Sequence, residues 1–462
     1  MDVEDIFREY DIRGVFNQDL TPEVISKIGV AFGTFLQGSG EVVVGRDTRV
    51  SSQILESIFS SSLASMGCDV TTVGMVPISV VNFSTWNRKP KAGAVVTASH
   101  NPPEYNGLRF RHSDGTGYVS ENKAIRDLYF GGRFLKKRWN EVGRIASIAS
   151  SETLTNYSGF IRDRVRIGRK LRVALDPGNG AACIVAPTLF KELGFEVFAI
   201  NDRPDGTFPG RDPDPSVEGR EVLSELSELV AKSKADFGVA YDGDGDRAVF
   251  VDEVGERAIP EKVAILFANE YLNKGKKKIV ANVSCSMILE DELSKAGGEV
   301  IRVRVGDVFI TEAIKVYKAA FAVEISSHFY FPDFYPFDDG ILASIKLAEI
   351  LSHSHEAFSE YLRKIRTYPS LRENVECPDR IKFKVIEIIK EKYQNEGYKI
   401  DLVDGIRVVM SEGWGLVRQS NTEPKIRITV EGRTKEASER LLSKFKFDVA
   451  NAIKKIGGLP PA

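Results

Sequence analysis

A pattern of strand, short turn, helix, glycine and strand occurs three times along the chain and constrains the fold more than any other feature. The first copy runs from EVVVG at 41–45, through a helical stretch that begins with SSQILES, to CDVTTVG. The second copy starts with LRVALD at 171–176, and the third with KKIVAN at 277–282. This order is typical of βαβ units, in which helices cover parallel strands.

Each copy is followed by a later strand that ends in a polar loop. AGAVV leads into TASHNPP, ADFGVAY into DGDGDR, and AAFAVE into ISSHF. Ligands of open α/β sheets bind beyond the ends of the strands, so we expect the three loops to face one cleft. The alternative is that these are the ordinary polar strand exits of any α/β protein.

The part of the chain beyond residue 367 has a different order of elements. A helical KFKVIEIIKEKYQ is followed by strands around DGIRVVM, WGLVR and KIRITVEG, and a last long helix begins near Thr434. A chain of 462 residues is also too long for one hydrophobic core. We therefore predict an α/β protein with three related α/β domains, with mixed sheets, around a central cleft, and a smaller C-terminal α+β domain. The predicted boundaries are 1–148, 149–250, 251–367 and 368–462.

The charge and cysteine content exclude several classes of protein. The net charge is −2 and there is no large basic block, which argues against a nucleic-acid partner. The N-terminus is acidic and no apolar run reaches the ~20 residues that span a bilayer, so we expect neither a signal peptide nor a membrane partner. The cysteines follow no C-x-x-C spacing, which indicates reduced thiols in the cytoplasm. They are Cys68, Cys183, Cys285 and Cys377.

The loop DGDGDR carries the most specific chemistry. Asp242, Asp244 and Asp246 alternate with two glycines directly after an apolar strand. Three carboxylates this close repel one another unless a cation lies between them. Glycine lets the backbone wrap around a small object, and carboxylate oxygens are ligands that suit Mg²⁺.

Two alternatives exist for this loop. One is a Ca²⁺ loop of the EF-hand type, because Glu253 stands at the twelfth position counted from Asp242. An EF-hand needs flanking helices, whereas strands are predicted on both sides here, so we favour Mg²⁺. The other alternative is an acidic turn that is merely solvated.

Three other segments offer receptors for a phosphate group. Arg13 lies in YDIRG, and the segment GRDTR ends a strand at residues 45–49. RQSNTEP combines a guanidinium with small polar residues, whose turn can direct backbone N–H groups at an anion. The alternative for RQSNTEP is an ordinary turn with a salt-bridged arginine. Its candidate phosphate ligands are Arg418, Ser420, Asn421 and Thr422.

The loop VEISSH can bind the hydroxyl groups of a polyol through Glu324 and Ser326, with His328 next to them. A single histidine after a strand is more often structural, and this alternative stays open.

Ser99 stands at the end of the first of the three late strands, followed by His100 and the stiff Asn-Pro-Pro. A serine held in place near a metal loop and near arginines is a candidate covalent carrier of phosphate. No G-x-S-x-G elbow surrounds it, which argues against acyl transfer.

These motifs together resemble the α-D-phosphohexomutase family, in its phosphomannomutase/phosphoglucomutase branch. TASHNPPEYNG resembles the family's phosphoserine loop, DGDGDR its metal loop, VEISSH its sugar-recognition loop and RQSNTEP its phosphate-binding loop. FREYDIRG and VGRDTR match further family motifs, and the order of all six spans nearly the whole chain. The family fold is three related α/β domains and a fourth α+β domain.

The resemblance implies a mechanism. Phosphorylated Ser99 would pass its phosphoryl group to a hexose monophosphate, and the hexose 1,6-bisphosphate would return the other one. Mg²⁺ would be bound by the three aspartates and by the phosphate on Ser99, with Arg247 orienting that phosphate. Glu324 and Ser326 would bind sugar hydroxyls, and RQSNTEP the phosphate that does not react.

The chain departs from the family pattern at several positions. Arg109 replaces the usual lysine, and a guanidinium is a poor proton shuttle. Asp307 stands where histidine is usual, and VEISSH differs from the family pattern G-E-M-S-G-H. We therefore expect His328 or Arg13, rather than Arg109, to assist proton transfer, and His100 is also counted with the catalytic candidates.

For the substrate we predict mannose and glucose phosphates, with a hexose 1,6-bisphosphate as activator. FREYDIRG differs from the F-G-T-D-G-x-R-G of glucosamine mutases, and Ile325 stands where those enzymes typically carry glutamine. The alternatives are a phosphoglucosamine mutase, a sugar-phosphate phosphatase, and a sugar-phosphate sensor without catalysis. Whether the protein is a monomer or a homo-oligomer is left open.

Overall fold

The computed structural model describes residues 3–217, 221–419 and 424–457. It divides into two compact units, and each is described by itself. Unit 1 comprises residues 1–260 and 326–362, and unit 2 comprises residues 261–325 and 363–462. Within the described ranges, no helix combines the length and the apolar character of a membrane span.

The first sheet of unit 1 has six strands in the order β1-β5-β4-β2-β3-β6. Strand β2 is parallel to β3 and β4, whereas β5 is antiparallel to β4 and β1, so the sheet is mixed as predicted. The strands are β1 (Ile12–Val15), β2 (Glu41–Arg46), β3 (Asp69–Met75), β4 (Ala92–Val96), β5 (Tyr105–Arg111) and β6 (Ile145–Ser147). The helices of this region are η1 (Val3–Ile6), α1 (Pro22–Phe35), α2 (Ser52–Ser65), α3 (Ile78–Arg88), α4 (Ser120–Gly131) and α5 (Ser150–Arg162).

Local sequence explains where α1 begins and which of its faces is buried. The Thr21 hydroxyl accepts a hydrogen bond from the Val24 N–H, and Pro22 occupies the first turn, where no N–H is needed. Phe32, one of the buried residues of α1, stacks on Phe110 of β5 with 4.2 Å between the ring centroids. This aromatic contact fixes the helix against the sheet.

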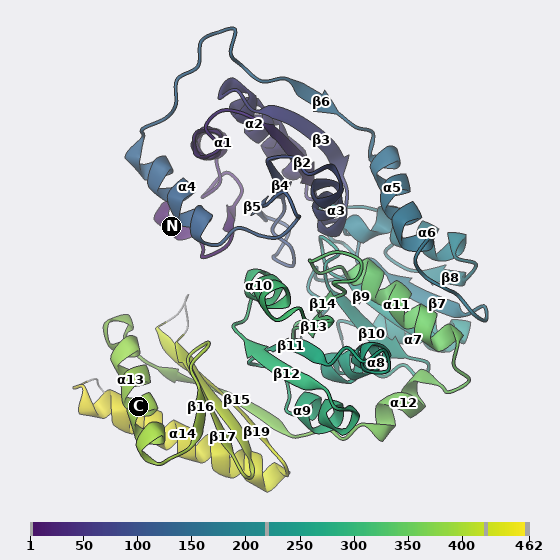
Figure 1. The fold of residues 1–462 in the computed structure, drawn as a ribbon, viewed down its shortest axis with the longest axis vertical. Helices are drawn as coiled ribbons and strands as arrows, with labels where there is room; N and C mark the ends of the chain where they lie inside the picture. Colours follow the sequence, from purple (N-terminus) through teal and green to yellow (C-terminus); the bar gives the residue numbers. More distant parts are fainter. Residues whose placement is uncertain (1–2, 218–220, 420–423, 458–462) are drawn as a thin grey trace. The chain divides into compact units, whose positions relative to one another are not determined.

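The second sheet of unit 1 has the order β10-β9-β7-β8 and is also mixed, because β7 is parallel to β8 and β9 while β10 is antiparallel to β9. Helix α11 lies along this sheet beside β9 and β10 (Figure 1). The strands are β7 (Arg172–Asp176), β8 (Glu196–Ala199), β9 (Phe237–Tyr241) and β10 (Ala248–Asp252). The other elements of this region are η2 (Ala181–Ile184), α6 (Ala186–Glu192), α7 (Ser224–Ser233), β14 (Phe329–Tyr330), α11 (Gly340–Ser352) and α12 (Phe358–Lys364).

Unit 2 contains a parallel region and an antiparallel sheet. In the parallel region, β11 (Lys278–Asn282) lies between β12 (Glu299–Val303) and β13 (Phe321–Val323). Its helices are α8 (Pro260–Leu272), α9 (Ile288–Leu293), η3 (Ser294–Ala296) and α10 (Asp307–Tyr317). This is the third of the predicted βαβ units.

The antiparallel sheet of unit 2 has the order β15-β19-β18-β17-β16, and α13 and α14 cover one of its faces (Figure 1). Helix α14 begins after Thr434, whose hydroxyl accepts from the Ala437 N–H. This start agrees with the one predicted near Thr434. The elements are β15 (Ser370–Glu376), α13 (Asp379–Asn395), β16 (Lys399–Asp401), β17 (Ile406–Met410), β18 (Gly413–Gln419), β19 (Lys425–Gly432) and α14 (Lys435–Lys455). The predicted fold class is therefore confirmed.

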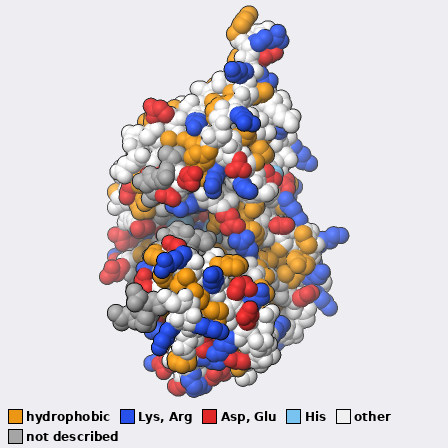
Figure 2. Space-filling model, turned by 90° about the vertical axis from the view of Figure 1, so that its left-hand side faces the viewer, with side chains coloured by type: hydrophobic (Ala, Val, Ile, Leu, Met, Phe, Trp, Pro, Cys, Tyr) orange, Lys and Arg blue, Asp and Glu red, His pale blue; other side chains and the backbone are white. Residues whose placement is uncertain are grey.

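One face of the molecule carries a mixture of charges of both signs (Figure 2). On the face drawn in Figure 2, Lys and Arg side chains alternate with Asp and Glu, without a continuous basic band. This distribution agrees with the net charge of −2.

Candidate active site

Ser99 lies in the loop that follows β4, and its backbone is strained. Its φ angle is +51°, in the left-handed region that residues other than glycine rarely adopt. The Ser99 N–H donates to the Thr97 hydroxyl at 2.8 Å, and the residue is only 3% exposed. Strain of this kind persists only where the surrounding contacts enforce it.

Arg49 supplies many of those contacts. Its side chain is fully buried, and its Nε lies 3.1 Å from Oδ2 of Asp47. Its other guanidinium N–H groups donate to backbone carbonyls of the loop. These carbonyls belong to Ser99 at 2.8 Å, Asn101 at 2.5 Å, Pro102 at 2.5 Å and Tyr105 at 3.0 Å. The prediction that GRDTR receives a phosphate does not fit Arg49, because these donors are already used within the protein.

Arg13 contacts the same loop from β1. Its Nη1 donates to Oδ1 of Asn101 at 2.6 Å and to the Ala98 carbonyl at 3.3 Å. Its Nε forms an ion pair with Asp11 at 2.7 Å. Arg13 is therefore close to Ser99, and its part in proton transfer stays a prediction.

The metal loop DGDGDR connects β9 to the antiparallel β10. Gly243 is required there, because a Cβ at this position would lie 2.5 Å from the Ser99 carbonyl oxygen. Gly245 has a φ angle of +83°, which places its N–H 3.0 Å from Oδ1 of Asp242. The two glycines thus let the loop curl around its own carboxylates and approach the serine loop closely.

The three carboxylates of this loop fit a cation. Asp242, Asp244 and Asp246 are each at most 1% exposed, and one oxygen of each lies within 4.8 Å of the others. Oδ1 of Asp244 and Oδ1 of Asp246 are buried and accept no hydrogen bond from the described residues. Buried oxygens without donors, in a cluster of like charges, are what a divalent cation with oxygen ligands would satisfy.

The electrostatics of the loop support this interpretation. Burial raises the pKa of Asp242 well above its ordinary value, and the neighbouring Asp246 and Asp244 raise it further. The pKa of Asp244 is raised by the same two causes, burial first and the charge of Asp246 second. A bound cation would offset both the cost of burying these carboxylates and the repulsion between them.

The EF-hand alternative is excluded by the surroundings of the loop. Strands, not helices, flank it, and Glu253 points elsewhere. The Glu253 carboxylate accepts from the N–H of Ser359 at 3.0 Å and from the Ser359 hydroxyl at 2.5 Å. Glu253 therefore holds α12 and is not a ligand of the loop.

The serine loop and the metal loop are joined directly. The Ser99 hydroxyl lies 3.1 Å from Oδ2 of Asp242, and the Thr97 hydroxyl donates to Oδ2 of Asp244 at 3.0 Å. A phosphate on Ser99 would therefore lie beside the carboxylates that fit a cation, as the resemblance implies.

Arg109 extends from β5, which pairs with β4 and so brings its side chain to the same loops. Its Nη1 lies 3.3 Å from Oδ2 of Asp246, and its side chain is 7% exposed. A guanidinium in this position balances negative charge and does not act as a base.

His100 lies next to Ser99 and is held as a neutral ring. Its Nδ1 is 3.1 Å from the Ser99 hydroxyl and 2.8 Å from Nη2 of Arg247. Burial lowers the pKa of His100 far below its ordinary value, and the charges of Arg247 and Arg13 lower it further. Nδ1 therefore accepts the Arg247 N–H.

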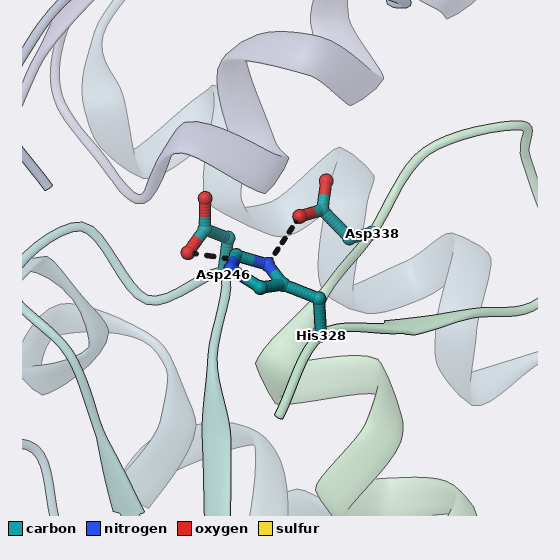
Figure 3. Close-up of side chains that lie close together, drawn as sticks. All are labelled: Asp246, His328 and Asp338. Atoms are coloured by element: carbon teal, nitrogen blue, oxygen red, sulfur yellow. Dashed lines mark hydrogen bonds and ion pairs between the residues drawn. The ribbon is translucent and has the colours of Figure 1, made fainter. Parts of the chain in front are cut away.

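His328 lies close to the carboxylates of Asp246 and Asp338 (Figure 3), and it also contacts Arg247. Its Nδ1 is 2.6 Å from Oδ2 of Asp338 and 3.7 Å from Oδ1 of Asp246. Burial alone would lower the pKa of His328, but Asp246 and Asp338 outweigh it and raise the pKa to about 10. This pKa lies above the range near neutrality in which a histidine side chain usually titrates.

The contact with Arg247 favours the neutral ring. Nε of Arg247 lies 3.1 Å from Nε2 of His328, and its N–H is donated to that nitrogen. Nε2 can accept only when it carries no proton. A cation bound by Asp246 would also cancel most of the attraction that raises the pKa. We therefore assign the ring proton to Nδ1, where Asp338 accepts it.

The predicted sugar and phosphate ligands lie in different parts of the chain. Glu324, in unit 2, is buried, and its Oε2 accepts from Nδ2 of Asn282 at 3.1 Å and from the Gly306 N–H at 3.1 Å. Ser326, in unit 1, is half-buried. Arg418 on β18 lies 3.8 Å from Asp404 and keeps 31% of its side chain exposed. Ser420, Asn421 and Thr422 lie outside the described residues.

Three residues of this network were not predicted. Thr97 orients both loops, and its place two residues before Ser99 in TASHNPP was a usable signal. Asp214 accepts from Nη1 of Arg247 at 3.1 Å, and Asp338 accepts from His328. Neither aspartate belongs to a pattern that points to this contact.

Models of four domains of the phosphoglucomutase/phosphomannomutase family match the chain in order. They are the alpha/beta/alpha domains I, II and III and the C-terminal domain, and they match residues 4–136, 154–255, 260–368 and 373–446.

Relatives align over nearly the whole chain. A protein of Methanothermobacter thermautotrophicus described as a probable phosphoglucosamine mutase is 38% identical over 453 residues, 97% of this chain and 98% of that relative. A phosphoglucomutase/phosphomannomutase of Thermococcus kodakarensis is 37% identical over 447 residues, 95% of this chain and 96% of that relative. The crystal structure of a phosphoglucomutase/phosphomannomutase family protein from Burkholderia thailandensis is 30% identical, with a TM-score of 0.89 and 99% of each chain covered.

Proposed function

This chain belongs to the phosphoglucomutase/phosphomannomutase family of α-D-phosphohexomutases and is an intramolecular phosphotransferase, and we propose that Ser99 carries its phosphoryl group. The observation that carries this proposal is the 3.1 Å distance between the Ser99 hydroxyl and Asp242 of the metal loop. Through this contact, the strained and buried Ser99 lies next to the carboxylate cluster that fits a cation.

The proposed reaction has two transfers. First, the bond between phosphorus and Oγ of phosphorylated Ser99 breaks, and a bond forms to the free hydroxyl of the hexose monophosphate. The product is a hexose 1,6-bisphosphate, and the proton of the sugar hydroxyl is passed to Oγ of Ser99, which becomes a hydroxyl again. In the second transfer Oγ of Ser99 takes the other phosphoryl group, the bond between that phosphorus and its sugar oxygen breaks, and the serine proton returns to this oxygen, which gives the isomeric monophosphate.

The side chains of the site support these transfers in distinct ways. Asp242, Asp244 and Asp246 would hold a divalent cation, for which we propose Mg²⁺, and its charge would stabilise the transferred phosphoryl group. Arg247 would orient the phosphate, which its contact with His100 next to the serine supports. Arg109 balances charge at Asp246.

The ligands of the sugar phosphate remain part of the proposal. We assign Glu324 and Ser326 to the sugar hydroxyls and Arg418, with Ser420, Asn421 and Thr422, to the phosphate that does not react. Arg418 supports this by its partly exposed guanidinium, which can form a bidentate contact with phosphate.

For the substrate we propose glucosamine phosphate, in contrast to the preference drawn from the sequence. The 38% identical relative that is described as a phosphoglucosamine mutase supports this alternative. Mannose and glucose phosphates are the second candidate. They are favoured by FREYDIRG and by the apolar Ile325, and by the 37% identical relative from Thermococcus kodakarensis.

We also propose the cytoplasm as the location, supported by four free and buried cysteines among the described residues. The proposed small-molecule partners are the hexose phosphate and the hexose 1,6-bisphosphate that primes Ser99.

A coupled assay with the 1-phosphates of glucosamine, mannose and glucose tests the function, with and without a hexose 1,6-bisphosphate. The highest kcat/KM is expected for glucosamine 1-phosphate, and a clear preference for mannose or glucose would establish the second candidate. Ser99→Ala should abolish turnover, and the wild-type mass should fall by one phosphate after phosphatase treatment. Release of inorganic phosphate instead of the isomer would indicate a phosphatase, and no reaction with any sugar a sensor.

A further inference from the structure

A chain of hydrogen bonds connects Asp338 to the proposed carrier Ser99. Asp338 accepts from Nδ1 of His328, whose Nε2 accepts from Nε of Arg247. Nη2 of Arg247 donates to Nδ1 of His100, which lies 3.1 Å from the Ser99 hydroxyl. These residues come from three separate segments of unit 1, so the chain of contacts exists only in the folded protein.

The first link determines the state of the histidine ring. The two atoms are 2.6 Å apart, and Asp338 is 3% exposed, so the contact is shielded from water. A carboxylate next to one ring nitrogen keeps the proton on that nitrogen and leaves the other as an acceptor. Without this partner, the proton could move to Nε2, which would then face the Arg247 N–H as a second donor.

The orientation of Arg247 depends on this state. Its Nε is used by His328, and its Nη1 donates to Asp214 at 3.1 Å and to the Ser216 hydroxyl at 2.9 Å. With both of these positions satisfied, Nη2 is directed at His100 beside the serine. If Nε2 of His328 became a donor, it would repel the Nε–H of Arg247, and the guanidinium group would rotate.

We propose that Asp338 is a positioning residue that sets the tautomer of His328 and through it the direction of Arg247 toward Ser99. This inference rests on the proposed role of Ser99 as the phosphoryl carrier. Asp338 does not touch the reacting atoms, and its effect passes through the histidine. Among the residues that the structure describes, His328 is the side chain that its carboxylate contacts (Figure 3).

The neighbouring aspartate has a different task and provides a matched control. Asp339 caps α11, with its Oδ1 accepting from the N–H groups of Ile341 at 2.9 Å and Leu342 at 3.0 Å. Asparagine is also a good N-cap, so Asp339→Asn should retain the helix. Asp338→Asn changes the adjacent residue in the same way, but at the contact with the histidine.

A metal ion is the competing explanation for this contact, because Asp246, His328 and Asp338 also lie close enough together to hold one. The short distance between Nδ1 of His328 and Asp338 leaves a proton, rather than an ion, between the two atoms. If a metal bound there, Asp338→Asn would lower the number of bound Mg²⁺ or Zn²⁺ ions per chain, and this result would overturn the proposal.

The test uses ¹⁵N-histidine labelling of the whole protein, because the chain has only five histidines. His328→Gln identifies the signals of His328 by their loss. In the wild type these signals should report a neutral ring with its proton on Nδ1, and in Asp338→Asn a shift toward Nε2–H. Asp339→Asn and Asp338→Glu should retain the wild-type tautomer.

Kinetics complete the test. Asp338→Asn should lower kcat by about tenfold or more, with KM nearly unchanged, as expected for a residue that positions a group acting in the transfer step. Adding it to His328→Gln should cause little further loss, because both act through one ring. An unchanged tautomer in Asp338→Asn, or a kcat loss that is additive with His328→Gln, would overturn the proposal. If instead Ser99→Ala remained active, the proposed function would fail while the tautomer result would still stand.

Discussion

The Nη2 of Arg49 lies 2.8 Å from the carbonyl oxygen of Ser99, and the Arg49 side chain is fully buried. A charged group is rarely placed in such a position unless its donors are satisfied, and here four loop carbonyls satisfy them. The strained backbone of Ser99 is thus enforced by an arginine that was expected to bind phosphate.

Replacing Arg49 should therefore damage catalysis more than charge alone would explain. Arg49→Lys retains the ion pair with Asp47 but cannot reach all four carbonyls, so Ser99 should lose its fixed position. We expect kcat to fall by about 100-fold, the cost of a misplacement of about 1 Å. The control is Arg46→Lys, whose side chain pairs with Glu56. Equal kcat values for the two variants would contradict this role.

Asp244 should destabilise the protein when no cation is bound. Its buried carboxylate repels Asp246, and Asp244→Asn removes this repulsion while its amide oxygen can still accept from Thr97. In a chelator, the variant should melt at a higher temperature than the wild type. Added Mg²⁺ should raise the melting temperature of the wild type more than that of the variant, and the kcat of the variant should fall. Equal stabilisation of both proteins by Mg²⁺ would rule out this ligand.

Asp339 should make stability depend on pH. Burial raises its pKa to about 6, although the hydroxyls of Tyr157 and Tyr335 and two backbone N–H groups donate to it. Between about pH 4 and pH 6 the folded state keeps a proton that the unfolded state has lost, so the free energy of unfolding falls as the pH rises.

Asp339→Asn cannot titrate and should lack this part of the fall, which is of the order of 1–3 kcal/mol. Chemical denaturation at several pH values measures the difference between the two proteins. Parallel stability curves for wild type and Asp339→Asn would mean that Asp339 titrates alike in both states.

Ser327 stands where the family resemblance implies glycine, and the structure explains that preference. Its φ angle is +69°, and its carbonyl accepts from the Ala248 N–H at 3.1 Å. Ser327→Gly should raise the free energy of unfolding by about 0.5–1 kcal/mol, because relief of the left-handed strain exceeds the entropic cost of glycine. Ser326→Gly, at a position without a positive φ angle, should lower it. The reverse order in thermal unfolding would show that the strain at Ser327 is negligible.

Much of the candidate site was predictable because its motifs are local. Alternating aspartates and glycines in DGDGDR specify a curled acidic loop by themselves, and Asn-Pro-Pro restricts the exit from Ser99. The hydrogen-bond partners of these motifs were harder to predict from the sequence. Ser99 and Asp242 are separated by 143 positions, and neither motif indicates that the other is its hydrogen-bond partner. The role of Arg49 differed from the prediction because a guanidinium suits a carbonyl and a phosphate equally well.

The sequence by itself determined the order of the βαβ units, the C-terminal α+β region and the residue types of the two central loops. These features follow from periodicity and from backbone preferences, which act over a few neighbouring residues. Only the tertiary structure decided the neutral state of His100, the partner of His328 and the orphaned oxygens of Asp244 and Asp246. The reason is physical: burial and charges from distant segments set a pKa or a tautomer, and those segments meet only when the chain has folded.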